Sequence, residues 1–316
     1  MKPLSLICSF LVCTCLFLLP GEFAPPAITL ALAGDVMLGR GVAQALNRDW
    51  EAAFAEVQPW LADADLTFAN LESPLTTAPP RSSPPQAGGR EGGYDLRASP
   101  ESVAALRAAG FDVVSLANNH APDAGQTGLR ETVDTLHAAG IGALLDGKAG
   151  GSVDCSPTCQ LLAFDDSVAP LDVKAAAGAV AAAAERADVV IVSIHWGGEY
   201  QAAPGPRQRS LARKLAGAGA GVIVGHGPHV LQRVEWVGET LVAYSLGNLL
   251  FDQPYPADCR QGVILRVTLQ GDRIAAVEAI PTVTEQGRLR LANPEEAAAI
   301  SDRIGLDTKI IQERKQ

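Results

Sequence analysis

The hydrophobic positions of this chain form short, nearly continuous apolar runs that alternate with segments of helical spacing. The runs have the length and β-branched content of buried strands, and the segments between them place apolar residues three and four positions apart. This alternation predicts an α/β protein with parallel strand pairing. The expected strands are residues 28–34, 66–70, 112–116, 160–164, 189–194 and 221–224, and the expected helices are residues 41–47, 100–109, 125–139, 175–186 and 206–218.

The pattern changes after residue 229. Short apolar segments follow one another, separated by Gly-Glu and Gly-Asp turns, which is typical of antiparallel hairpins. Residues 76–93 are rich in proline, glycine and serine and are expected to form a long surface loop. The expected hairpin strands are residues 230–237, 241–245, 262–269 and 274–280, and a short amphipathic helix is expected from residue 294.

The first residues read as a targeting segment. Lys2 precedes an apolar run from Leu4 to Leu19 that Pro20 and Gly21 close. This is the pattern of a secretory signal. We expect residues 1–24 to be a signal peptide or an uncleaved N-terminal anchor, with the body of the protein outside the cytoplasm. The body is expected to be one domain, residues 28–281, followed by a tail with a short helix, residues 282–316.

Composition and charge argue against some classes of binding partner. The chain has 316 residues, of which 47% are hydrophobic and 19% charged, as in a globular protein. Its formal net charge of −10 argues against a nucleic-acid partner and against simple docking to anionic lipid. A polyanionic substrate would therefore have to be held locally, by a metal ion.

Three of the six cysteines lie in the first fifteen residues. In an oxidising compartment, Cys155 and Cys159 could close a small disulfide loop, and Cys259 is left over or pairs with one of them.

Histidine shows the clearest candidate chemistry. Four of the five histidines come just after apolar strands, and His137, inside an expected helix, is interpreted as a surface residue. Strands of one sheet collect the residues past their carboxyl ends in one crevice, so these side chains are expected to converge with nearby carboxylates and an amide. The expected metal ligands are Asp35, Glu72, Asn119, His195, His226 and His229.

The segment Asn118-Asn119-His120 suggests a division of roles. An amide oxygen is a modest metal ligand, so Asn119 can contact the metal ion. The adjacent His120 then lies within reach of whatever the metal binds and could protonate a leaving group as a general acid, with Asp123 orienting its imidazole. Mixed nitrogen and oxygen ligands suit Mn, Zn or Fe. The sequence therefore predicts a site for one or two divalent transition-metal ions.

Several ordered motifs carry a family resemblance. They are Gly34-Asp35-Val36-Met37-Leu38, Asn70-Leu71-Glu72-Ser73-Pro74-Leu75, Leu116-Ala117-Asn118-Asn119-His120, His195-Trp196-Gly197, Gly225-His226 with Pro228-His229, and Tyr244-Ser245-Leu246-Gly247-Asn248. Together they resemble the CapA family of capsule synthesis proteins, associated with poly-γ-glutamate, over about residues 28–280. That family is similar to calcineurin-like metallophosphoesterases, which implies an α/β fold with four α/β/β/α layers built on two mixed sheets.

The match to the phosphoesterase pattern is partial. That pattern begins Asp-x-His, and Met37 stands where the histidine would be, while Glu72 stands near a position that is an aspartate there. One metal subsite therefore lacks an imidazole.

The resemblance implies a protein of capsule or poly-γ-glutamate biosynthesis with a metal-dependent hydrolytic centre. Its substrate would be an anionic polymer or a phosphoester, and a membrane polyglutamate synthetase complex is an expected partner. Two alternatives remain open: a non-catalytic accessory subunit that binds the polymer or the synthetase, and a general phosphoesterase unrelated to capsule.

Overall fold

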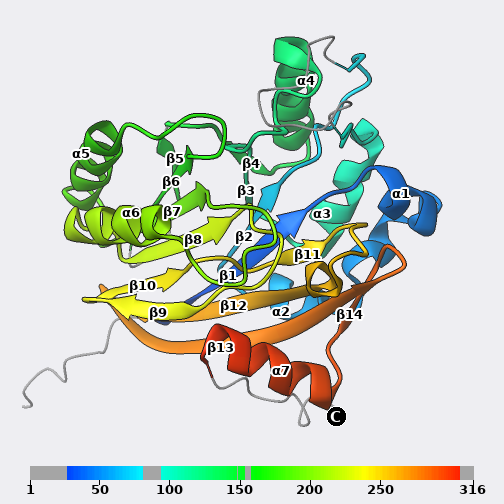
Figure 1. Ribbon diagram of the computed structural model, residues 1–316. Helices are drawn as coiled ribbons and strands as arrows, with labels where there is room; N and C mark the ends of the chain where they lie inside the picture. The colour runs from blue at the N-terminus through cyan, green and yellow to red at the C-terminus, as the bar shows by residue number, and fades with distance from the viewer. Residues whose placement is uncertain (1–26, 81–93, 148, 154–157, 307–316) are drawn as a thin grey trace, which may run out of the picture.

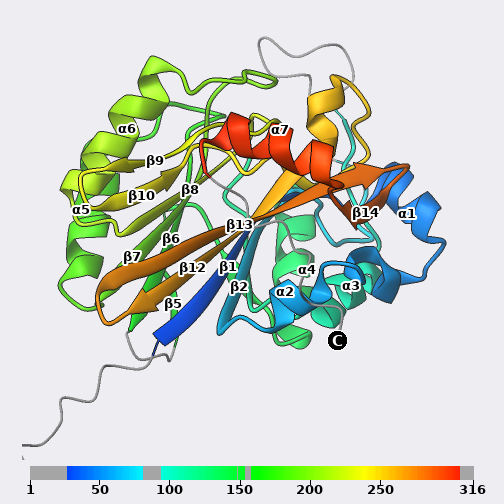
Figure 2. The same cartoon turned by 90° about the horizontal axis from the view of Figure 1, so that it is seen from below.

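The computed structural model describes residues 27–80, 94–147, 149–153 and 158–306. The expected signal segment and Cys155 lie outside these residues. Two mixed sheets pack face to face within the described part of the chain, and helices cover both outer faces, so four layers are visible (Figure 2). The α/β/β/α architecture implied by the resemblance is confirmed.

The first sheet combines parallel and antiparallel pairing around a central strand. That strand pairs in parallel with two neighbours and antiparallel with a third. Across the sheet the order is β14 (Arg288–Leu291), β13 (Arg273–Glu285), β12 (Gln261–Gln270), β1 (Ala27–Val36), β2 (Leu66–Leu71), β3 (Val113–Ser115) and β4 (Gly142–Leu144), with β11 (Asn248–Leu250) beside β1.

The second sheet is parallel in its middle and antiparallel at both edges. Its two last strands form one of the expected hairpins, and the second strand of that hairpin, residues 240–243, also pairs in parallel with the middle of the sheet. The order is β5 (Ala149–Val153), β6 (Cys159–Asp165), β7 (Val189–His195), β8 (Val222–His226), β10 (Thr240–Ala243) and β9 (Val234–Val237).

The helices divide between the two outer faces (Figure 1). Those from the first half of the chain cover the first sheet, and two from the middle cover the second. The first group is α1 (Arg40–Leu46), η1 (Trp50–Phe54), α2 (Gln58–Ala62), η2 (Pro100–Ser102), α3 (Val103–Ala109) and α4 (Gly125–Ala138); the second is α5 (Val173–Ala184) and α6 (Pro206–Gly217); η3 (Ala257–Arg260) and α7 (Pro294–Ile304) follow.

The apolar runs are continuous because both faces of their strands are buried. On β1, Leu30 and Leu32 face the second sheet, whereas Ala31 and Ala33 face the helices. Successive side chains of a strand point to opposite faces, so a strand in the middle of a sandwich needs apolar residues at every position.

The carboxyl-terminal part of the described chain joins the same body. β13 runs through residue 281, where the sequence suggested a domain boundary, and β14 pairs with it. α7 begins as expected at Pro294 and buries Ile300 and Ile304 in the core between the sheets. The expected strand over residues 230–237 begins only at Val234; before it, Leu231 makes an isolated bridge to Leu246, and the buried side chain of Gln232 accepts a hydrogen bond from Gln208.

Candidate metal centre

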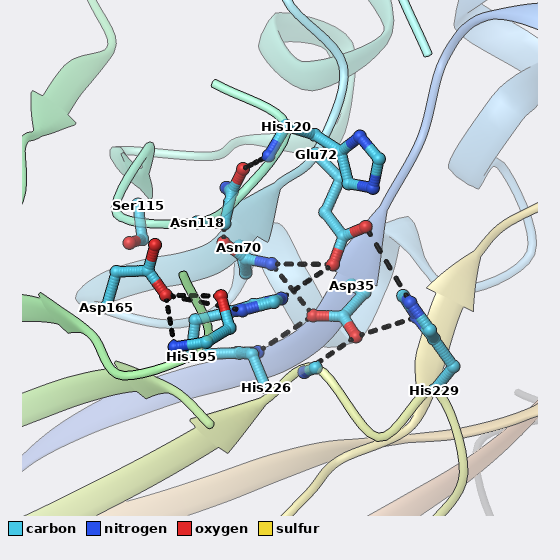
Figure 3. A network of polar contacts seen from close by, with 12 residues as sticks. Asp35, Asn70, Glu72, Ser115, Asn118, His120, Asp165, His195, His226 and His229 are labelled. Atoms are coloured by element: carbon cyan, nitrogen blue, oxygen red, sulfur yellow. Dashed lines mark hydrogen bonds and ion pairs between the residues drawn. The ribbon is translucent and has the colours of Figure 1, made fainter. Parts of the chain in front are cut away.

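Five of the residues singled out in the sequence lie at or just after strand ends of both sheets and meet in one buried cluster (Figure 3). The first sheet supplies carboxylates, Asp35 from the end of β1 and Glu72 from the end of β2. The second sheet supplies imidazoles, from the ends of β7 and β8, where His195 and His226 are neighbours in register, and from His229 just after β8. Four contacts link them: His226 and His229 with Asp35, and His195 and His229 with Glu72.

Asp35 occupies the centre of the cluster. Its Oδ1 lies 3.2 Å from Nδ1 of His226, and its Oδ2 lies 3.3 Å from Nδ1 of His229. The backbone N–H of Gly227 also points at Oδ2, at 3.4 Å. Both carboxylate oxygens therefore face the second sheet.

Glu72 lies beside Asp35, at the end of β2. Its Oε1 is 3.1 Å from Nε2 of His195, and its Oε2 is 3.9 Å from Nε2 of His229. His229 thus bridges the two carboxylates.

Several buried atoms of the cluster have no hydrogen-bond partner among the described residues. A buried polar atom without a partner costs about 1–3 kcal/mol, so such atoms are uncommon, and several in one place indicate a missing ligand. They are Oε2 of Glu72, Nδ1 of His195 and both ring nitrogens of His226.

These residues could hold a metal ion. Asp35, Glu72 and His229 each offer one ligand atom, and these atoms lie within 4.8 Å of one another. Carboxylate oxygen and imidazole nitrogen are the donors that Mn, Zn and Fe accept. The side chains therefore fit a transition-metal ion.

The charges of the cluster shift its pKa values. Burial alone would raise the pKa of Asp35, but contacts with His226 and His229 hold it well below its usual range. Burial likewise opposes the charge of Glu72, yet the positive charge of His229 and the contact with His195 keep its pKa low. Burial lowers the pKa of His229, whereas the charges of Glu72 and Asp35 outweigh this and raise it to about 10. In the metal-free protein, the protonated imidazole of His229 therefore offsets part of the negative charge of the two carboxylates.

His120 borders the cluster from the segment after β3. Its Nδ1 is 3.0 Å from Oδ2 of Asp123, as the sequence suggested. Burial lowers the pKa of His120, but the hydrogen bond to Asp123 and the negative charges of Glu72 and Asp123 produce a net increase. The ring is thus fixed through Nδ1, and its side chain stays partly exposed.

Asn118, rather than its neighbour Asn119, shapes this segment. The Asn118 side-chain oxygen accepts hydrogen bonds from the backbone N–H groups of His120 and Ala121, at 3.0 and 2.9 Å. Its amide group donates to Asn70 and to the carbonyl of Leu71. The side-chain oxygen of Asn119 is buried and has no hydrogen-bond partner among the described residues.

Glycines allow the histidine loop to approach closely. Gly227 has φ +104°, and a Cβ there would lie 3.1 Å from Cε1 of His195. At Gly225 a Cβ would lie 2.1 Å from the carbonyl oxygen of Tyr244. Side chains at these positions would push His226 and its neighbours away from the carboxylates.

The structure adds three polar residues that the sequence did not single out as site residues. The amide of Asn70 donates to Asp35 at 2.9 Å and to Glu72 at 3.3 Å, so it fixes both carboxylates. The side-chain oxygen of Asn248 lies 3.0 Å from Nδ1 of His229. Asp165 pairs in register with His195 across β6 and β7, and its Oδ1 lies 3.8 Å from Nδ1 of that histidine.

Asp165 could have been found from the sequence, because it follows the apolar run 160–164 just as the other candidates follow theirs. Met37, where the phosphoesterase pattern has histidine, is buried in the core beneath the helices of the first sheet. His137 is exposed on α4, as expected.

The fold and the cluster define the class: an α/β/β/α sandwich whose strand ends carry a buried group of carboxylates and imidazoles that could hold a metal ion. A solved structure, a hypothetical protein from Thermus thermophilus, shares this fold with a TM-score of 0.52 and 17% identity over 82% of this chain and 100% of that chain.

The chain belongs to the family described as bacterial capsule synthesis protein PGA_cap, whose model matches residues 29–149 and 153–253. It is 30% identical over 297 residues to "Capsule biosynthesis protein CapA" of Bacillus anthracis, covering 82% of this chain and 68% of that protein. It is 31% identical over 281 residues to "PGA biosynthesis protein CapA" of Bacillus subtilis, covering 82% and 72%. A "Probable polyglutamine synthesis accessory protein" of Mycobacterium tuberculosis is 27% identical over 299 residues, covering 72% and 75%. The CapA resemblance is thereby confirmed.

Proposed function

We propose that this protein acts in the synthesis of a capsule or poly-γ-glutamate polymer and that its buried cluster is a metal-dependent hydrolytic centre. The observation that carries the proposal is the group of buried, unpartnered ligand atoms around Asp35 and Glu72. The names of its relatives, which refer to capsule, PGA and polyglutamine synthesis, supply the biological setting.

A divalent cation bound by these residues would polarise a substrate oxygen. The protein's own residues would do the rest. Asp35 and Glu72 would hold the cation, with imidazoles from the second sheet. Hydrolysis adds one water across the scissile bond, and His120, fixed through Nδ1 by Asp123, would give its proton from Nε2 to the leaving group.

Two variants test this mechanism. His120→Ala should leave Mn²⁺ binding unchanged and reduce turnover by about 10²–10⁴. Asp35→Asn should abolish Mn²⁺ binding measured by calorimetry, because it removes the central charge of the cluster. Wild-type protein should hydrolyse poly-γ-glutamate or a generic phosphodiester, and hydrolysis of the phosphodiester alone would favour a general phosphoesterase.

The second candidate function is a non-catalytic accessory subunit, which the name of the mycobacterial relative favours. It would use the same cluster to bind the anionic polymer or a membrane synthetase. Wild type would then hydrolyse neither substrate, and His120→Ala would still support capsule production in cells.

We also propose that the body of the protein lies outside the cytoplasm, on the evidence of the apolar run from Leu4 to Leu19. Within the part of the chain that the structure describes, no helix is both long and apolar enough to cross a membrane.

A further inference from the structure

The side chain of Asn248 is buried beside the metal cluster, and the backbone of β11 sets its position. That strand lies parallel to β1, with Asn248 opposite Asp35. The backbone N–H of Asp35 donates to the carbonyl of Gly247 at 2.9 Å, which holds the two strands together at this point. Asn248 is completely buried, so its polar atoms need partners within the protein.

The neighbours of Asn248 determine which end of its side-chain amide is the nitrogen. One end lies 2.9 Å from the backbone carbonyl oxygen of Cys259 and 3.0 Å from the side-chain oxygen of Gln253. A backbone carbonyl can only accept hydrogen bonds, so the atom that faces it must be the NH₂ group. The amide oxygen therefore points the other way, toward Nδ1 of His229 at 3.0 Å.

Two hydrogen-bond acceptors face Nδ1 of His229. They are the amide oxygen of Asn248, at 3.0 Å, and Oδ2 of Asp35, at 3.3 Å. An amide oxygen and a carboxylate oxygen accept hydrogen bonds and donate none, so Nδ1 must carry a hydrogen. In the neutral imidazole, which is the form that binds metal, the free lone pair then belongs to Nε2.

Nε2 of His229 faces the second carboxylate of the cluster (Figure 3). It lies 3.9 Å from Oε2 of Glu72, which is beyond hydrogen-bond distance. That oxygen has no hydrogen-bond partner among the described residues. When His229 is neutral, two lone pairs thus lie close together with no hydrogen between them, and a metal ion would accept both.

The ring of His229 is also held from another side. Phe251 packs edge-on against it, with the ring centroids 5.2 Å apart and the planes at 61°. A half turn of the imidazole would put a carbon atom in the place of Nδ1. The buried amide oxygen of Asn248 would then lose its donor, which makes this orientation unfavourable.

We infer that Asn248 is a positioning residue of the metal centre. It holds His229 as the tautomer with hydrogen on Nδ1, so that Nε2 is the nitrogen offered to a metal ion, beside Oε2 of Glu72. The inference rests on the proposed function and names the atoms by which two residues of that site would bind the ion. An imidazole that binds metal through one nitrogen commonly donates the hydrogen of the other to a carbonyl or a carboxylate, which fixes its orientation.

The first experiment determines the tautomer directly. The protein is labelled with ¹⁵N-histidine and loaded with Zn²⁺, which has a filled d shell, and its imidazole nitrogens are observed by NMR. The ring of His229 is identified through its contact with Phe251. We expect Nδ1 of His229 to carry a hydrogen that exchanges slowly with water, and Nε2 to have the shift of a metal-bound nitrogen.

The second experiment compares Asn248→Ala with a matched control, Thr284→Val. The buried hydroxyl of Thr284 donates to the carbonyl of Leu249 at 3.1 Å, so its loss weakens the same strand without removing a partner of His229. Calorimetry measures the affinity for Zn²⁺ and Mn²⁺. We expect Asn248→Ala to bind either ion about 10–100-fold more weakly and to lose the slowly exchanging signal, whereas Thr284→Val should change the affinity by less than about twofold.

A hydrogen on Nε2 with Zn²⁺ on Nδ1 would overturn the inference. So would an Asn248→Ala protein whose affinity is within about twofold of wild type. If Thr284→Val lost as much affinity as Asn248→Ala, the role of Asn248 would be only to support the strand, and the inference would fail.

The spectrum of wild type decides the tautomer even where Asn248→Ala does not fold. If wild type takes up neither ion, the inference and the proposed metal-dependent function fail together. Uptake of Zn²⁺ through Nδ1 of His229 defeats the inference alone.

Discussion

Replacing Gly225 with alanine tests how closely the second sheet must pack to place its histidines. A Cβ at Gly225 would lie 2.1 Å from the carbonyl oxygen of Tyr244 and 2.4 Å from Nε1 of Trp196. That nitrogen donates to the same carbonyl at 2.9 Å, so the new methyl group would also break a buried hydrogen bond. Overpacking costs about 1–3 kcal/mol, and an indole N–H left without an acceptor costs about 1–3 kcal/mol more. We therefore expect the free energy of unfolding to fall by about 2–6 kcal/mol.

Urea denaturation of the metal-free protein, followed by circular dichroism, measures this loss. With a denaturant dependence of about 3 kcal/mol/M, the midpoint should fall by about 1–2 M. Gly178→Ala on α5 is the matched control, because no atom lies within 4 Å of a Cβ there, and helix propensity should raise stability by about 0.5–1 kcal/mol.

The same variant should bind Mn²⁺ at least about tenfold more weakly, since His226 follows Gly225 directly and ligand geometry has to be held closely. A Gly225→Ala protein with the midpoint of wild type would refute the reasoning. So would a Gly178→Ala protein that loses as much stability.

Further predictions concern the pH dependence of metal binding and stability, two residues that support the site or the fold, and the location of the protein. Because the pKa of metal-free His229 is about 10 and a metal ion must displace its proton, the apparent Mn²⁺ affinity should rise about tenfold per pH unit between about pH 6.5 and 10, measured by calorimetry. Over the same pH range the metal-free protein should become less stable in urea denaturation. The protonated His229 stabilises the fold fully below about pH 6.5, and this contribution disappears as the pH passes 10. A Mn²⁺ affinity that does not change with pH would contradict the raised pKa of His229. Asp165→Asn should weaken Mn²⁺ binding by about 10–100-fold with little change in melting temperature, because the Asp165 carboxylate lies 3.8 Å from Nδ1 of His195 and a carboxylate beside the second nitrogen of a ligating imidazole supports metal binding, and an unchanged affinity would remove that role. Asn293→Ala should cost about 1 kcal/mol in urea denaturation, because its side chain accepts from two backbone N–H groups at the start of α7; no loss would contradict the cap. Protease should reach the protein from outside in intact spheroplasts, and full protection would contradict the proposed location.

The sequence predicted the parts of the fold that depend on local pattern. Strands such as β7 and β8 were readable because they are buried on both faces and therefore apolar throughout. β11 and β14 were missed, because strands of three or four residues contain too little pattern and form only through pairing with distant partners. The turns of η1 and α2 were missed for a similar reason, since each covers only five residues.

For the candidate site too, the residues that follow a local sequence pattern could be predicted, and the contacts that depend on strand pairing could not. Asp35, Glu72 and the histidines could be named because each comes just after an apolar run. The bridging role of Asn70 could not, since it depends on the pairing of β1 with β2, which places the ends of two strands side by side. The contact of Asn248 with His229 depends in turn on β11 lying next to β1.

The oxygen ligands of the cluster belong to one sheet and the imidazoles to the other, so neither half of the sandwich contains a complete site. A bound ion would link the two sheets, because each sheet supplies part of its ligands. Its binding energy would resist the sliding of one sheet over the other, and a folding intermediate with a single sheet formed would have no affinity for it. Metal uptake would therefore require both sheets to be formed and packed against each other.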